Sequence, residues 1–142
     1  MLNLLIIVIL ANGGAVSPRP QYFHAPHGGY AAVVVPVGKP GYENQESVIE
    51  IRRGRALIKR RSFASDDGEH GFGVTNSAWT PDGEFFLFSM QSSGGHQPWH
   101  WPIYVYSVRT NTLYELENYI GSITSNFVLL RGNRLRTTRI NP

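Results

Sequence analysis

The sequence of 142 residues contains no cysteine. Disulfides, thiolate metal ligands and cysteine nucleophiles are therefore excluded, although many small exported domains rely on their core alone. A helical i, i+3, i+4 pattern is never sustained over three turns, which predicts little helix. The nucleophile-elbow, phosphate-loop and dinucleotide fingerprints are also missing, so we expect a non-enzymatic protein that uses no cofactor.

Charged residues are sparse, at 16% of the chain, and acidic residues are missing after Glu117. The net charge is nevertheless +3, because basic residues cluster in RRGRALIKRR (52–61) and RGNRLRTTR (131–139). Such clusters suit an anionic polymer, a phospholipid surface or nucleic acid. They are equally typical of solvated edge strands, whose positive charge discourages aggregation. We favour the solvated strands, and export would argue against nucleic acid as a partner.

No apolar run is long enough to span a bilayer as a helix, so no transmembrane segment is expected in the mature chain. The N-terminal run Leu2–Ala11 has the length of a signal-peptide core and is followed by small residues. We predict that residues 1–17 are a signal peptide and that the protein is exported to the periplasm or the cell exterior. No basic residue precedes the run, which departs from the usual pattern, and a buried N-terminal strand is the alternative.

Turn-forming residues are abundant, with 15 glycines and 9 prolines, and they separate short β-branched and aromatic segments. We predict an all-β fold, a small antiparallel sheet or sandwich built from strand–loop–hairpin units. Residues 18–29 are expected to be a flexible leader and residues 30–142 a single β domain. The unbroken apolar run EFFLFSM (84–90) indicates a central strand that is buried on both faces. The other strands are expected at 30–37, 48–51, 56–60, 74–79, 103–108, 112–116, 126–130 and 135–140.

One plan of strand, long loop, short strand, turn and strand occurs twice, over Tyr30–Phe63 and Glu84–Tyr119. Within residues 77–116, SAWTPDGEFFLFSM and PIYVYSVRTNTLYEL resemble one blade of a WD40-like β-propeller of the TolB type. The resemblance implies a blade-like antiparallel fold and transfers no catalytic residue. A closed propeller needs at least four blades. This chain has strands for about two and a half. It therefore forms a small sheet or sandwich alone, or assembles as a homo-oligomer.

Two long loops, 64–73 and 91–102, carry the candidate functional residues. The second contains HQPWHWP and is rich in aromatic side chains, which anchor protein interfaces and stack on sugar rings. We predict a protein partner or an envelope polymer bound through both loops. The alternative is that the tryptophans pack the loop onto the sheet. The predicted binding residues are His96, Trp99, His100, Trp101 and Tyr104.

The same loops allow a metal-dependent or hydrolytic site as the alternative function. Pro98 and Pro102 exclude a helix that would place both histidines on one face, so the ligands must come from loops that meet. In the first loop, Asp66–Glu69 also suits a plain Asx-type turn, which we favour over a calcium site. The candidate metal ligands are Asp67, His70, His96 and His100.

Overall fold

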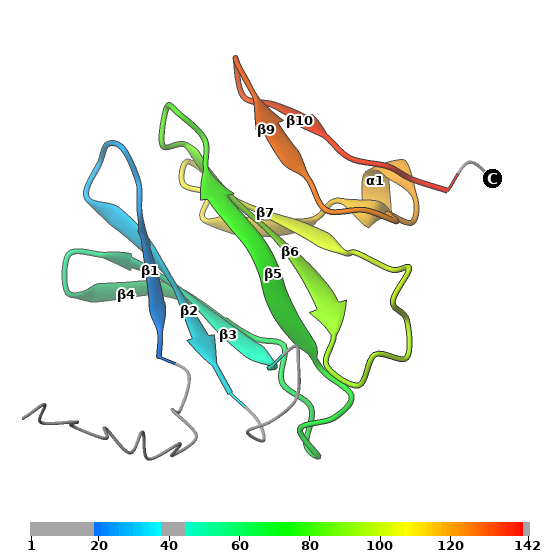
Figure 1. The fold of residues 1–142 in the computed structure, drawn as a ribbon. Coiled ribbons are helices and arrows are strands. Elements are labelled where there is room, and N and C mark those ends of the chain that lie inside the picture. Colours follow the sequence, from blue (N-terminus) through cyan, green and yellow to red (C-terminus); the bar gives the residue numbers. More distant parts are fainter. Residues whose placement is uncertain (1–18, 38–44, 141–142) are drawn as a thin grey trace, which may run out of the picture.

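The computed structural model describes residues 19–37 and 45–140 (Figure 1), so the predicted signal peptide lies outside the described residues. The all-β prediction is confirmed, because the described strands form antiparallel sheets of four, four and two strands. None of the described helices is long and apolar enough to cross a membrane. The elements are β1 (Gln21–His24), β2 (Tyr30–Pro36), β3 (Ser47–Arg53), β4 (Ala56–Ser62), β5 (Phe72–Trp79), β6 (Phe85–Ser92), β7 (Ile103–Ser107), β8 (Thr112–Glu115), α1 (Glu117–Ile120), β9 (Val128–Leu130) and β10 (Arg134–Arg136).

The segment that we expected to be a flexible leader contains a strand. In β1, Gln21 pairs with Val34 and His24 pairs with Ala31, so the first sheet begins before residue 30. A tight turn closes this hairpin, since the backbone N–H of Ala25 donates to the carbonyl of Tyr30. The short strand has no long apolar alternation of its own, and its pairing with β2 is what orders it.

The first and second sheets have the same plan, with strands in the orders β1-β2-β3-β4 and β5-β6-β7-β8. Their first turns also correspond in sequence, because Pro26 and Gly28 precede Pro81 and Gly83 by 55 positions. Both glycines have positive φ, at 79° and 71°, a conformation that glycine adopts without steric cost. The repeated plan predicted from the sequence is therefore present in the topology. Each unit also includes the strand that precedes it, which is β5, predicted at 74–79, in the second sheet and β1, which was not predicted, in the first.

A first hydrophobic core fills the space between the two four-stranded sheets. Side chains from β2 and β3 meet those of β6 and β7, in keeping with the period-two alternation of strands. Phe86 and Phe88 are fully buried here, and their ring centroids lie 5.9 Å apart. The buried members of this core are Ala32, Val34, Ile49, Ile51, Phe86, Phe88, Met90 and Tyr106.

A second core lies on the opposite face of the second sheet. Leu87 and Ile103 project from this face and pack against Ile123 and Phe127, beside the β9–β10 hairpin. Figure 1 shows the resulting order, with the hairpin on one side of β5–β8 and the first sheet on the other. The predicted central strand is confirmed, because β6 lies between β5 and β7 and both of its faces are buried.

Candidate functional site

The two long loops meet at one end of the stacked sheets. Because β5 and β6 are antiparallel neighbours, with Phe72 paired to Ser92, the residue before β5 lies beside the residue after β6. The backbone N–H of Ser93 donates to the carbonyl of Gly71 at 2.9 Å. A side chain at Gly94 would lie 2.5 Å from the carbonyl of Glu69, so the loops touch without space between them.

The carboxylate of Glu46 joins the first sheet to both loops. Its side chain, just before β3, is 1% exposed. Oε1 accepts hydrogen bonds from Ser65 Oγ at 2.6 Å, from the N–H of Gly71 at 2.7 Å and from Ser93 Oγ at 3.0 Å. Oε2 accepts a bond from the N–H of Ser65 at 2.9 Å. One buried side chain therefore holds together segments that are far apart in the sequence.

The hydrogen bonds keep Glu46 ionised. Burial by itself would raise the pKa of this carboxyl, but the bonds from Ser65, Gly71 and Ser93 outweigh it and lower the pKa below its ordinary value. Our sequence analysis missed Glu46, because a single acid in a turn-rich segment belongs to no motif. Its partners lie 19 to 47 positions away in the chain.

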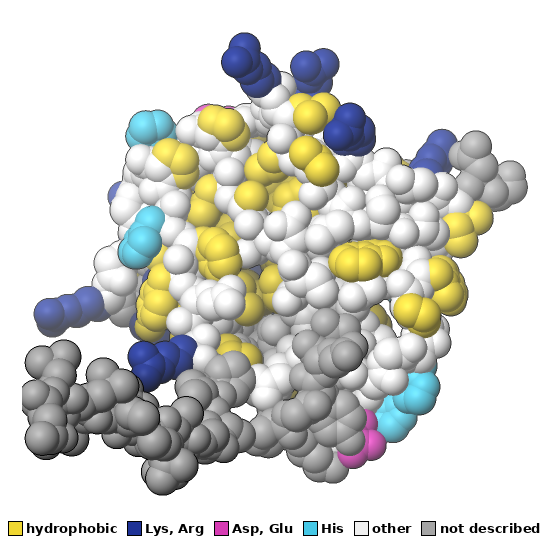
Figure 2. Space-filling view, in the orientation of Figure 1, with side chains coloured by type: hydrophobic (Ala, Val, Ile, Leu, Met, Phe, Trp, Pro, Cys, Tyr) yellow, Lys and Arg dark blue, Asp and Glu magenta, His cyan; other side chains and the backbone are white. Residues whose placement is uncertain are grey.

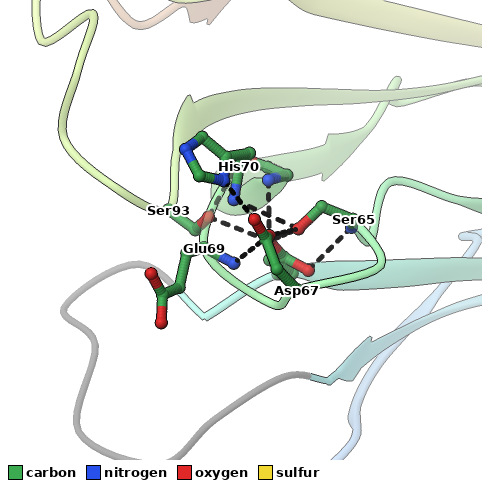
Figure 3. A network of polar contacts seen from close by, with 7 residues as sticks. Ser65, Asp67, Glu69, His70 and Ser93 are labelled. Carbon is green, nitrogen blue, oxygen red and sulfur yellow. Dashed lines mark hydrogen bonds and ion pairs between the residues drawn. The ribbon is translucent and has the colours of Figure 1, made fainter.

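The acidic turn of the first loop is an Asx-type turn, as predicted. Asp67 Oδ1 accepts a hydrogen bond from the backbone N–H of Glu69 at 2.9 Å. The bond from Glu69, followed by those from Ser65 and His70, lowers the pKa of Asp67. Figure 3 shows these residues converging at the start of β5, with Ser93 reaching in from the other loop. The hydroxyl of Ser65 lies between Asp67 and the Glu46 carboxylate and has one hydrogen, so it donates to one of them at a time.

Of the four predicted metal ligands, Asp67, His70 and His96 lie near one another, whereas His100 has a different partner. The rings of His70 and His96 are stacked, with centroids 5.5 Å apart, and Asp67 bonds to Nδ1 of His70. His100 instead places Nε2 at 2.7 Å from an oxygen of Glu117. Within the described ranges, no group of three or more His, Cys, Asp or Glu side chains could hold a metal ion.

The five predicted binding residues do not form one patch. His96 and Trp99 are exposed, with Trp99 at 51%, and they lie on the outside of the second loop. The side chain of Trp101 packs against the second core, and its backbone N–H donates to the carbonyl of Ile123. Tyr104 packs on the first core, where burial followed by the charge of Glu115 raises its pKa to about 12.

The fifth predicted binding residue, His100, is held in place by polar contacts at the base of the second loop. His100 is half-buried, and its two ring nitrogens face oxygens of Glu117 and Gln97. The other carboxylate oxygen of Glu117 accepts the backbone N–H of Ile123 at 2.6 Å. His100 therefore fixes the base of the loop, while Trp99 remains on its surface.

A substitution at Gly71 tests the close approach of the two loops. A β-carbon at this position would lie 2.4 Å from the carbonyl oxygen of Phe63 and 2.6 Å from the Glu46 carboxyl, neither of which can move freely. We expect Gly71→Ala to lower the free energy of unfolding by about 2 to 3 kcal/mol. Gly95→Ala is the comparison, since a β-carbon there meets nothing within 4 Å and only its positive φ opposes the change. Urea unfolding followed by circular dichroism measures both, and equal losses would contradict the contact.

Comparison of the chain with protein-family models, with curated proteins and with solved structures found no match. The resemblance of residues 77–116 to a propeller blade therefore stays a prediction.

Proposed function

We propose that this protein is an exported, non-enzymatic β domain that binds a protein partner or an envelope polymer through loops 64–73 and 91–102. The observation that carries the proposal is the joining of both loops into one surface by the buried Glu46, with Trp99 left 51% exposed on it. Export rests on the N-terminal sequence pattern alone.

A surface held in this way favours binding, because little conformational entropy is lost when a partner docks on loops that are already ordered. Trp99 supplies a large, rigid apolar contact at the edge of this surface, next to the ring of His100 at 5.5 Å. The stacked rings of His70 and His96, both of them exposed, add a second aromatic group to the same two loops. Aromatic side chains on a rigid backbone are typical of the residues that contribute most of the binding energy in an interface.

Substitution of the exposed tryptophan tests the proposal. We expect Trp99→Ala to weaken capture of the partner from an envelope extract by about tenfold or more, as for the loss of an interface hot spot. The folded state should be unaffected, because the side chain is half exposed. The immobilised wild-type and variant chains are compared for bound material, with and without protease treatment of the extract, which separates a protein from a polymer.

Tyr22→Ala is the matched control, since Tyr22 is also an exposed aromatic residue, at 63%, but lies on β1 of the first sheet. Equal capture by wild type and Trp99→Ala would contradict the loop surface as the binding site. Capture no greater than that of the bare support would contradict the binding role itself.

A further inference from the structure

The third sheet has only two strands, so each of them lies at an edge, and the edge of interest is the outer one of β10. The sheet consists of β9 and β10 alone, paired from Arg134–Leu130 to Arg136–Val128. In the second sheet, β5 and β6 form the first hairpin, and β7 pairs with the other edge of β6. In the third sheet, β9 and β10 correspond to β5 and β6. Within the described ranges no strand occupies the corresponding position next to β10. The backbone groups along that edge of β10 are therefore available to another strand.

An apolar groove runs beside this free edge. A cavity of about 260 Å³ lies between Leu87 and Val105 of the second sheet and Leu135 of β10. A larger cavity, of about 730 Å³, shares the lining residues Leu116 and Leu135 with the first. A polar cavity of about 410 Å³, between β4 and β8, shares neither of them. Because the first two cavities are both lined by Leu116 and Leu135, they are neighbours along β10, and we call them together the groove. Between the first and second sheets, side chains of β7 and β8, such as Tyr106, fill the space that corresponds to this groove.

Arginines surround the groove. Arg134, Arg136 and Arg139 line the larger cavity. Arg134 donates a hydrogen bond to the backbone carbonyl of Arg131, and Arg139 donates one to the backbone carbonyl of Ile120. No ion pair involves these arginines within the described part of the chain, and the sequence has no acid after Glu117. Figure 2 shows basic side chains gathered over the β9–β10 hairpin, next to hydrophobic ones.

We propose that an extended peptide with alternating apolar and acidic side chains binds here by adding a strand to the free edge of β10. Its backbone would pair with β10, which is the general mode of strand addition to an open sheet edge. Alternate side chains of a strand point to opposite faces. Apolar residues would therefore enter the groove over Val105 and Leu116, while the acidic residues face the arginines.

The charge and the strand edge together select this occupant. A polyanion such as nucleic acid would use the arginines but would leave the groove over Leu116 and Leu135 unfilled. A second copy of this chain would bring further positive charge, because each copy carries a net charge of +3. An acidic and apolar strand satisfies the backbone edge, the apolar floor and the positive rim at once. The surface is separate from loops 64–73 and 91–102.

The test uses a synthetic fluorescein-labelled peptide of nine residues in which valine and glutamate alternate. We expect it to bind, and we expect the analogue with lysine in place of glutamate to bind at least about tenfold more weakly, because like charges meet at the arginines. An analogue with proline at alternate positions should lose binding, since proline cannot donate to a strand ladder. Fluorescence anisotropy gives the affinities, and amide chemical shifts should change along β10 and around Leu116.

Variants of the chain complete the experiment. The double substitution Arg134→Glu and Arg136→Glu should weaken peptide binding by about tenfold or more, whereas Arg55→Glu, in the exposed β3–β4 turn, should not. Trp99→Ala should bind the peptide like wild type, so failure here and failure of the loop surface can be distinguished. The proposal is overturned by equal binding of the glutamate and lysine peptides. It is also overturned by shift changes that leave β10 untouched, or by self-association of the chain through β10 in sedimentation.

Discussion

Replacing Glu46 with alanine is expected to lower the free energy of unfolding by about 4 kcal/mol, because each buried donor left without an acceptor costs roughly 1 to 3 kcal/mol. Four donors bond to the carboxylate: the backbone N–H groups of Ser65 and Gly71, which lose their acceptor, and the hydroxyls of Ser65 and Ser93, which can turn to Asp67 and to the Gly71 carbonyl. They belong to both long loops, so the loop surface should lose its order together with its stability. Urea unfolding gives the loss of stability, and amide hydrogen exchange in residues 64–73 gives the loss of order.

Glu46→Gln separates the charge from the shape of the side chain. Glutamine keeps one oxygen in the place of Oε1, where three of the bonds arrive, but its amide group would face the N–H of Ser65. We therefore expect a smaller loss than for alanine. Glu50→Gln, four residues further along in β3, is the control, since Glu50 is only half-buried and bonds to Arg52. A loss at Glu46 no larger than at Glu50 would show that the carboxylate does not hold the loops.

The same carboxylate makes stability depend on pH. Its pKa in the folded protein is lowered from the ordinary value of 4.5, so it contributes stability that is fully present above that pH. This contribution is lost as the pH falls through the lower, folded-state pKa. Wild type should thus approach Glu46→Gln in stability below pH 4.5, and the gap should be widest near neutral pH. Asp67 and Asp82 also have lowered pKa values. Both residues are present in wild type and in Glu46→Gln, so their effect cancels in the difference in stability between the two proteins.

Truncation of neighbouring side chains on β6 should be costly on both faces of the strand. Phe86 is fully buried against the first sheet, and Phe86→Ala is expected to cost about 4 kcal/mol. Leu87 is 4% exposed and points the other way, toward Ile123 and Phe127. We expect Leu87→Ala to cost about 3 kcal/mol. Circular dichroism during urea unfolding is the measurement, because Phe86 contacts Trp79 and would disturb indole fluorescence.

Leu57→Ala provides the comparison on an outer strand. Leu57 lies in β4 and is 50% exposed, so its truncation removes few contacts and should cost less than about 1 kcal/mol. If Leu87→Ala were as mild as Leu57→Ala, the hairpin β9–β10 would not pack on the second sheet. In that case the groove beside β10 would also lose its floor.

Local chemistry made several elements predictable. The strand β6 begins with the apolar and aromatic run FFLF (85–88), and such a run is stable only where both faces are covered. In the Thr80–Gly83 turn, Asp82 accepts bonds from Thr80 Oγ1 and from the backbone N–H of Glu84, and Gly83 has a φ of 71°. Both features depend on residues close together in the chain, which is why the sequence sufficed for them.

Other features depend on contacts that the pattern cannot reveal. Within the predicted binding set, Trp99 is exposed while Tyr104 is packed in the first core. Period-two alternation along β7 places Tyr104 and Tyr106 on the same face of the sheet. The alternation does not say which face is covered, because that depends on how the sheets stack. The strand β1 likewise exists because β2 lies beside it.

The sequence by itself determined the all-β class, the central position of β6 and the turn chemistry of Thr80–Gly83, because these follow from the period and the conformational preferences of neighbouring residues. Only the tertiary structure decided that the two loops meet, that Glu46 holds them, and that β10 keeps a free edge beside an arginine-lined groove. The physical reason is the same in each case. A hydrogen bond or a packing contact between residues dozens of positions apart depends on how the sheets stack, and no local pattern encodes that arrangement.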